Sequence, residues 1–294
     1  PFTEKGIMSF LAACLLHDIG HFPYAHSLKE LSIREHEEIA GTMILEEGEL
    51  RRSVEKTGAD PVMVAAIIDK DLLTGDEETL FYRNVLSGTL DPDKLDYLSR
   101  DGFFAGVPYG RQDTDFIISS LSLHNSRLCI DREAIGSVEQ ILFSKYMMYK
   151  SIYWHKGVRS ATAMIKKALI TAINDHSITF EDLYGIDDST FFLLCRDKKK
   201  MTPALEMVER VEYNHLLERK AVKEYERRGV IETKGKRPED RIEVENTIYN
   251  RPNRSYPLLK PWEVVIDIPE PISFETHISI YSPDGTVSDI SDEE

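Results

Sequence analysis

The 294-residue chain has few cysteines and no long apolar run. Its three cysteines, Cys14, Cys129 and Cys195, lie far apart and form no CxxC pair. A disulfide framework is therefore not expected, and a thiol-reducing cytoplasm is the simplest location. No apolar segment reaches the ~18 residues needed to cross a bilayer, and no secretory signal is visible. We therefore expect a cytoplasmic location and no membrane partner.

Positive charge is also scarce, because 36 basic residues face 51 acidic residues and the formal net charge is −15. This excess of acid argues against strong binding to duplex nucleic acid or to an anionic membrane, since both are negatively charged. It does not exclude a small phosphorylated ligand held by a local group of Lys and Arg. With 41% hydrophobic residues, the chain can bury a substantial core.

The apolar spacing predicts a mainly α fold, in which a helical bundle carries a short β-hairpin and a small C-terminal α/β appendage. The segment over residues 7–16 is apolar on nearly every helical face, which predicts a buried helix. The hairpin is expected over residues 121–131, and strands over 262–268 and 277–282. Helices are expected over residues 7–16, 27–47, 60–72, 137–172, 179–184 and 203–228, with one more beginning near residue 91.

Changes in composition and in predicted secondary structure along the chain also predict its domain organisation. A core is expected over residues 1–175 and a helical extension over residues 176–229. A small α/β tail with an acidic C-terminus is expected over residues 230–294.

The stretch LLHDIGHFPYAH places His17 and Asp18 side by side at the end of the first apolar segment. Imidazole nitrogen and carboxylate oxygen suit a divalent metal such as Mn, Mg, Fe, Ni or Zn. The alternative is that these two side chains simply cap the end of a helix. An unpartnered buried charge is costly, however, and three further histidines follow closely. These are His21, His26 and His36.

A second unusual stretch, DPDKLDYLSRD, falls on the helix that begins near residue 91. At 100° per residue, one stripe roughly 120° wide carries a carboxylate, an ammonium, a phenol and a guanidinium group. A solvated charged face would show a similar pattern, although the two phenylalanines that follow make simple solvation less favourable. The residues on this stripe are Asp93, Lys94, Tyr97, Arg100 and Asp101.

Together, HDIGHFPYAH and DPDKLDYLSRD resemble the motifs of the HD-domain phosphohydrolases, and more narrowly those of the deoxynucleoside triphosphate triphosphohydrolase branch. The similarity runs from about residue 7 to about residue 170. It implies one divalent metal held by His17, Asp18 and Asp93. The family supplies a further His ligand well before the His-Asp pair, which falls upstream of Pro1, so residues 1–175 resemble an N-terminally incomplete HD core.

The resemblance also implies catalytic roles for two of the later histidines. It makes His26 the general acid that protonates the departing oxygen, which suits an imidazole because its pKa lies near neutrality. His36 and His21 would contact phosphate or position that acid. Many family members carry an acidic residue where this chain has Lys29, and this departure puts the orientation of His26 in doubt.

Further matches imply a nucleotide-binding surface. Lys94 and Tyr97 match phosphate-contacting positions, and Asp101 matches the residue that reads the sugar 3′-hydroxyl. A second stripe, on the expected helix over residues 137–172, suits the far phosphate and the base or sugar, although ordinary packing between helices would explain it equally well. Its residues are Lys145, Tyr149 and Tyr153.

The activity implied is hydrolysis of a deoxynucleoside triphosphate to a deoxynucleoside and inorganic triphosphate by a homo-oligomer. Two alternatives stay open at this point. One is a nucleotidase or cyclic-nucleotide phosphodiesterase of the HD family, and the other is a catalytically weak nucleotide-binding regulatory protein. The sequence leaves the identity of the metal and the preferred base undetermined.

Overall fold

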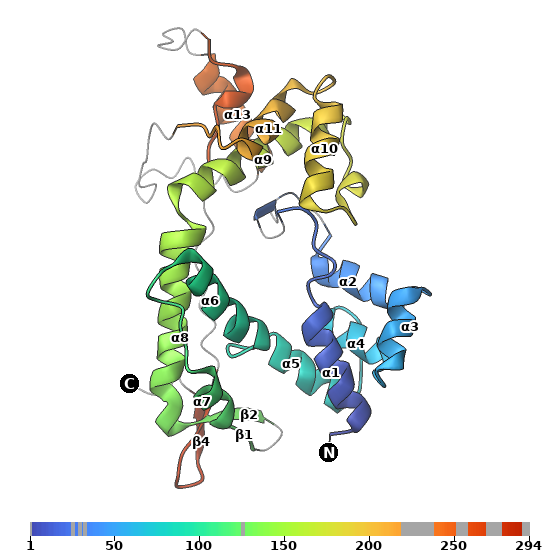
Figure 1. Ribbon diagram of the computed structural model, residues 1–294, viewed down its shortest axis with the longest axis vertical. Helices are drawn as coiled ribbons and strands as arrows, with labels where there is room; N and C mark the ends of the chain where they lie inside the picture. The colour runs from blue at the N-terminus through green and yellow to red at the C-terminus, as the bar shows by residue number, and fades with distance from the viewer. Residues whose placement is uncertain are drawn as a thin grey trace. The chain divides into compact units, whose positions relative to one another are not determined.

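In the residues that the structure describes, the protein is mainly helical with a small four-stranded sheet, which confirms the predicted fold class (Figure 1). No described helix is long and apolar enough to cross a bilayer, and the cytoplasmic location stays a prediction. The computed structural model describes residues 2–24, 27–28, 31, 34–124, 127–218, 238–250, 258–268 and 278–289.

The chain divides into two compact units, which are treated separately below. Unit 1 comprises Pro1–Gly20, His36–Tyr153 and Pro271–Glu294, and unit 2 comprises His21–Glu35 and Trp154–Glu270. The domain boundaries expected near residues 175 and 229 stay a prediction.

Unit 1 begins with five helices whose contacts create a common apolar core. Helix α4 packs against α1, α2 and α5, and the core between them includes Ala13, Ile44 and Val64. The helix expected over residues 27–47 begins only at His36. The five helices are α1 (Glu4–Leu16), α2 (His36–Leu45), α3 (Glu49–Lys56), α4 (Pro61–Ile68) and α5 (Glu77–Leu86).

The prediction that the first helix is buried is wrong for one of its faces. Ile7 and Leu11 of α1 are each about half exposed, and Leu15 is 83% exposed. The residues of α1 that are buried are the small ones, including Ser9 and Ala13, because α4 approaches α1 closely there. Because α1 has apolar residues on nearly every face, its sequence alone did not show which face packs against the core.

Helix α6 (Pro92–Ala105) has local signals for both of its ends. The Asp91 carboxylate accepts a hydrogen bond from the Lys94 amide at 2.6 Å, and Pro92 occupies the first turn, where its missing N–H costs nothing. The helix ends at Gly106, whose φ of +66° lies in the left-handed region that favours glycine. The short helix α7 (Thr114–Ser119) follows.

The sheet joins a hairpin to two strands from the C-terminal part of the chain. β1 (Leu121–His124) and β2 (Arg127–Asp131) are antiparallel, as the sequence predicts. β3 (Ser279–Tyr281) runs parallel to β2, and β4 (Val287–Asp289) runs antiparallel to β3, in the order β1-β2-β3-β4. The strand expected over residues 277–282 is therefore confirmed.

The long helix expected over residues 137–172 is wrong as a single element. The chain forms α8 (Ile135–Met148), continues as the π-helical turn η3 (Tyr149–Tyr153) and then starts a new helix, α9 (Lys156–Asn174). A residue next to the helix marks where α9 begins. His155 is its N-cap, and the His155 ring accepts a hydrogen bond from the Gly157 amide. Apolar residues keep the helical spacing of 3.6 residues through this junction, so the spacing alone did not indicate that the helix is interrupted.

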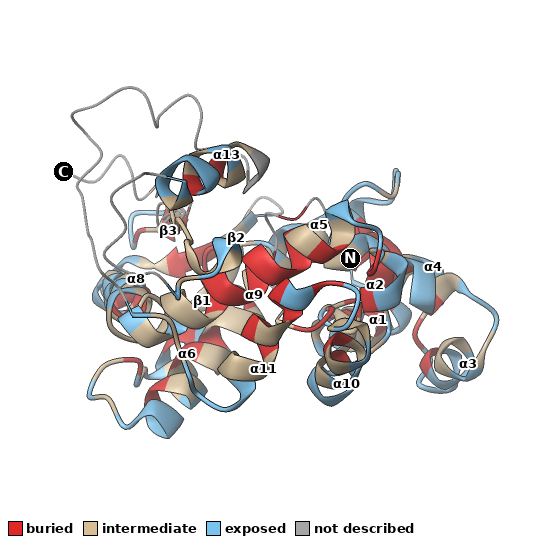
Figure 2. Ribbon diagram, turned by 90° about the horizontal axis from the view of Figure 1, so that it is seen from above, coloured by how far each residue is buried: buried red, intermediate tan, exposed pale blue. Residues whose placement is uncertain are grey.

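Unit 2 is built around α9, which is buried along most of residues 162–172 (Figure 2). Met164 and Leu169 of α9 pack in one cluster with Phe191 of α10 (Asp188–Lys198) and Met207 of α11 (Glu206–Glu212). The described part of unit 2 also contains α13 (Pro238–Tyr249) and the 3-10 helices η4 (Glu181–Leu183), η5 (Pro203–Leu205) and η7 (Pro261–Glu263).

Three helical or strand predictions in unit 2 need correction. Residues 181–183 form only a single 3-10 turn, and the helix expected over residues 203–228 ends at Glu212 within the described residues. The strand expected over residues 262–268 is absent, because the Ile266 amide bonds to the Glu245 carboxylate instead of to a neighbouring strand.

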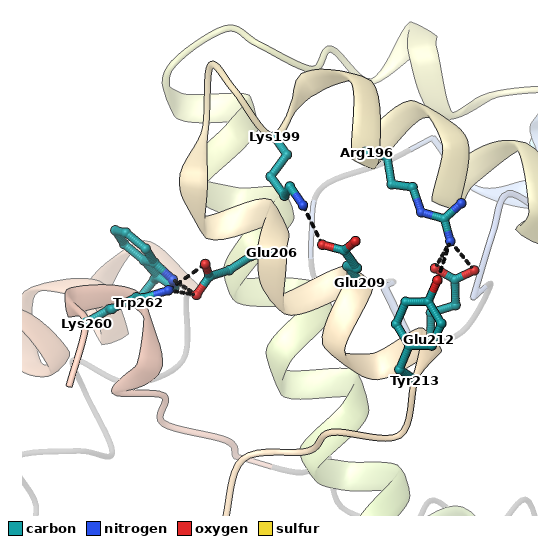
Figure 3. Close-up of polar contacts among 8 residues, drawn as sticks. All are labelled: Arg196, Lys199, Glu206, Glu209, Glu212, Tyr213, Lys260 and Trp262. Atoms are coloured by element: carbon teal, nitrogen blue, oxygen red, sulfur yellow. Dashed lines mark hydrogen bonds and ion pairs between the residues drawn. The ribbon is translucent and has the colours of Figure 1, made fainter. Parts of the chain in front are cut away.

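Three carboxylates one turn apart connect α11 to its surroundings (Figure 3). Glu209 pairs with Lys199 and Glu212 with Arg196, each at 2.5 Å, and both cations come from the end of α10. Glu206 accepts hydrogen bonds from the Lys260 ammonium and, at 3.2 Å, from the Trp262 indole. Such exposed pairs each contribute roughly 0–1 kcal/mol, so they align elements that the apolar core already holds.

Candidate metal centre

The His-Asp pair and Asp93 converge in unit 1, although they are far apart in the sequence. His17 and Asp18 follow the last turn of α1, and Asp93 lies in the first turn of α6. Nε2 of His17 lies 3.2 Å from Oδ1 of Asp18 and 3.8 Å from Oδ1 of Asp93. One donor atom from each of the three residues lies within 4.8 Å of the other two. The three predicted metal ligands are therefore brought together.

The hydrogen bonding of His17 fits a metal ligand. Its Nδ1 donates to the backbone carbonyl of Cys14 at 3.0 Å, so Nε2 is the nitrogen that faces the two carboxylates and is available to a metal ion. Ligand histidines in metalloproteins are commonly oriented by such a bond to a carbonyl group. One nitrogen and two carboxylate oxygens fit a divalent ion of the Mn, Mg, Fe, Ni or Zn group.

The electrostatics of Asp93 point the same way. Burial raises the pKa of the Asp93 carboxyl, His17 opposes the shift, and Asp18 adds to it. Two carboxylates with one imidazole accumulate negative charge in a partly buried place, which a divalent cation would neutralise. The donor set and its charge therefore fit the predicted metal.

His36, the first residue of α2, lies beside Asp18. Its Nε2 is 3.8 Å from Oδ1 of Asp18, and its Nδ1 is 3.0 Å from the Glu37 carboxylate. Gly20 makes this approach possible, because a Cβ at Gly20 would lie 2.0 Å from the His36 carbonyl oxygen. The HDxG spacing thus carries a packing requirement as well as two candidate metal ligands.

The other predicted histidines cannot be assigned a position at this centre. His26 and its neighbour Lys29 lie outside the described residues, and His21 belongs to unit 2. The roles of His21, His26 and His36 stay predictions.

Lys94 is held at the start of α6. Its Nζ lies 2.5 Å from Oδ2 of Asp91 and 2.9 Å from the Gly88 carbonyl oxygen. Burial raises the pKa of the Asp91 carboxyl, although Lys94 opposes that shift. The sequence analysis did not single out Asp91, which caps α6 and pairs with Lys94, although the Asp-Pro start of the helix is a typical N-cap signal.

The two predicted substrate-binding stripes meet through Asp101. The Tyr153 hydroxyl, on η3, donates to Oδ2 of Asp101, on α6, at 2.6 Å. The rings of Tyr149 and Tyr153 meet edge to face with centroids 5.1 Å apart. Burial raises the pKa values of Tyr97 and Tyr153, so both phenols are neutral donors at physiological pH. Lys145, on α8, is buried in the same unit.

The family described as the HD associated region matches residues 112–292, which is more than half of the chain. The chain belongs to this HD-associated family. This match, together with the similarities described next, supports membership of the HD superfamily.

Two curated relatives and one solved structure illustrate the similarity. The Bacillus subtilis protein YwfO is 32% identical over 167 residues, covering 56% of this chain and 37% of YwfO. The Dictyostelium discoideum deoxynucleoside triphosphate triphosphohydrolase SAMHD1 homolog is 24% identical over 222 residues, covering 71% of this chain and 42% of that protein. The chain thus spans less than half the length of either relative.

The solved structure is a phosphohydrolase from Bacteroides thetaiotaomicron. It superposes with a TM-score of 0.68 at 22% identity, covering 100% of this chain and 76% of that one. At this level of identity, the similarity concerns the fold alone.

Proposed function

We propose that this protein is a metal-dependent phosphohydrolase that cleaves deoxynucleoside triphosphates to deoxynucleoside and inorganic triphosphate. The observation that carries the proposal is the convergence of His17, Asp18 and Asp93 from two distant helices. Membership of the HD superfamily supports a phosphohydrolase in general. The narrower activity is supported by the Dictyostelium relative, whose name states it.

The metal held by these three residues would supply Lewis acidity toward a phosphate oxygen and lower the pKa of a water molecule. His17 contributes an oriented nitrogen, because its bond to the Cys14 carbonyl fixes the tautomer. Asp18 and Asp93 contribute the negative charge that favours a divalent ion over a monovalent one.

The polar groups of α6, α8 and η3 would bind the nucleotide. Lys94 and Lys145 provide positive charge for the phosphates, and the neutral Tyr97 hydroxyl can donate to a phosphate oxygen. Tyr153 holds one oxygen of Asp101, so the other oxygen can accept a hydrogen bond from the 3′-hydroxyl of the sugar. His26 would protonate the departing 5′-oxygen.

Product analysis tests the reaction. Full-length protein is incubated with each of the four deoxynucleoside triphosphates and Mn²⁺ or Mg²⁺ in ¹⁸O-labelled water, and the products are separated by anion-exchange chromatography. We expect deoxynucleoside and triphosphate in equal amounts, with one labelled oxygen in the triphosphate, because water attacks the α-phosphorus. Release of a nucleoside monophosphate with pyrophosphate would contradict the proposal.

Two further arms address the alternative activities. Turnover of dAMP or of a cyclic nucleotide, without turnover of the triphosphates, would identify a nucleotidase or phosphodiesterase. A rise in melting temperature with dATP or dGTP, without any product, would identify a nucleotide-binding protein. The predicted homo-oligomer is checked on the same preparation by light scattering with and without nucleotide.

A further inference from the structure

A cavity of about 200 Å³ lies in unit 1, between α5 and the β1-β2 hairpin. One wall is formed by the end of α5 and the loop that leads to α6, including Val85 and Gly88. The other wall is formed by the β1-β2 hairpin, including Leu121 and Leu128, together with Ile278 just before β3. The cavity is separate from the metal centre, since none of its lining residues is a predicted site residue.

The lining combines apolar side chains with polar groups, among them Asn84 and Thr89. Leu90, Ile130 and Ile278 are each less than 10% exposed, so buried apolar side chains form part of the lining. An apolar cavity of ~150 Å³ in another protein is large enough to bind benzene. A space of about 200 Å³ therefore accommodates a molecule of one or two fused rings, or an aliphatic chain of comparable volume.

Arg127 supplies the charge that this apolar space otherwise lacks. It is the first residue of β2, it is exposed, and it belongs to the cavity lining. It is the only charged side chain among the described lining residues, and it forms no ion pair with any carboxylate in the described part of the chain. Asn84 of α5 adds an exposed amide to the lining.

We propose that this cavity binds a small apolar molecule that carries one acidic group, with the apolar body between α5 and the hairpin and the acid on Arg127. A guanidinium can hold a carboxylate or sulfonate with two parallel hydrogen bonds, which gives both affinity and orientation. A neutral molecule of the same shape would gain only the apolar contacts. This binding site is independent of the proposed hydrolase activity.

The cavity is adjacent to a segment that holds a predicted site residue. The Gly88 carbonyl accepts the hydrogen bond from Lys94 Nζ, and Gly88 itself lines the cavity. A ligand that packs against this segment restricts its motion and therefore holds that carbonyl in place. Binding is thus expected to slow amide hydrogen exchange over residues 84–94.

The test uses 2-naphthoate as the probe and 2-naphthamide as its neutral match, each titrated into full-length protein by calorimetry. We expect naphthoate to bind about tenfold more tightly than naphthamide, because only the acid forms a charge-assisted bond to Arg127. Arg127→Ala should remove that difference while leaving naphthamide affinity within about twofold, and Arg127→Lys should restore part of it. Arg52→Ala, which removes another exposed arginine, from α3, is the matched control.

Variants that fill the cavity with a larger side chain show whether the probes bind in this cavity or elsewhere on the protein. Val85→Trp should abolish binding of both probes, and Leu128→Phe should weaken both, with circular dichroism showing that each variant is folded. The proposal is overturned if naphthoate does not bind at about 1 mM, if Arg127→Ala leaves the two probes as different as before, or if both filling variants bind normally. Unchanged hydrogen exchange over residues 84–94 in the bound protein would place the probe elsewhere.

Discussion

The Tyr153 hydroxyl donates a 2.6 Å hydrogen bond to Oδ2 of Asp101, and this contact joins two segments that are 52 positions apart. Asp101 lies two turns after Asp93 on α6, while Tyr153 ends the π-helical turn after α8. The bond therefore connects α6, which carries the predicted metal ligand Asp93, with the turn that directly follows α8. It orients the carboxylate that the proposed reaction assigns to the sugar.

Tyr153→Phe tests the importance of this bond. Loss of a hydrogen bond to a carboxylate should lower the free energy of unfolding by about 1.5 kcal/mol, measured by urea denaturation. Tyr109→Phe is the matched control, because Tyr109 packs against the same core cluster and donates no hydrogen bond to a described residue. Equal stability of the Tyr153→Phe variant and the unaltered protein would mean that the contact is not maintained in solution.

Asp93→Ala tests the metal centre. Removing one of three donors should lower metal affinity by about a hundredfold or more and abolish turnover, while the far-ultraviolet circular dichroism stays unchanged. Metal content is measured by mass spectrometry after dialysis against a defined metal concentration. Asp96→Ala is the control, since Asp96 lies on the same helix and pairs with Arg100 in an exposed contact. Full metal content in the Asp93→Ala protein would exclude Asp93 as a ligand.

Lys94→Ala should act through two routes. It should weaken nucleotide binding more than it lowers metal content, because Lys94 is proposed to contact phosphate and not metal. It should also destabilise the fold by about 3 kcal/mol, because Asp91 is buried and loses its cation. The double variant Lys94→Met/Asp91→Asn should regain part of that stability. A stable single variant would show that Asp91 does not depend on Lys94, and equal losses of metal and nucleotide would contradict the phosphate role.

Gly20→Ala tests the packing role of the HDxG motif without changing its two candidate metal ligands, His17 and Asp18. The added Cβ would meet the His36 carbonyl oxygen and the Ala40 amide, both backbone atoms that cannot rotate away. We expect a loss of about 2 kcal/mol or more in stability, measured by thermal unfolding. Gly48→Ala is the control, because no atom lies within 4 Å of its Cβ position and its φ of −171° suits any residue. A neutral effect at Gly20 would mean that α2 does not pack closely against this loop.

Glu206 should make stability depend on pH. Burial raises the pKa of Glu206, but hydrogen bonds from Lys260 and Trp262 outweigh it, so the folded-state pKa lies below the usual 4.5. A lowered pKa means that the carboxylate contributes stability above about pH 4.5, and that this contribution is lost as the pH falls through the folded-state pKa. Glu206→Gln should flatten the stability profile between about pH 5 and 3. Exposed Glu243→Gln is the control, and identical profiles for the two variants would contradict the assignment.

Local signals in the sequence were sufficient for several elements. The Asp-Pro start and glycine end of α6 lie within a few residues of the helix, and the alternation around residues 125–126 indicated the hairpin. The junction at Tyr149–Tyr153 and the irregular segment over residues 264–268 were missed, since apolar spacing does not record which hydrogen bonds the backbone makes.

The sequence by itself determined the chemistry of the candidate site, because imidazole and carboxylate groups in the HD pattern and in the α6 stripe are the donors that a divalent metal requires. Only the tertiary structure decided that His17 and Asp93 meet. That proximity depends on α5, which contacts both α1 and α6, and such packing is set by side chains distant in the sequence. The packing of α8 against α6 likewise decided that Tyr153 reaches Asp101, whereas the pairing of Lys94 with Asp91, three residues apart on α6, is local.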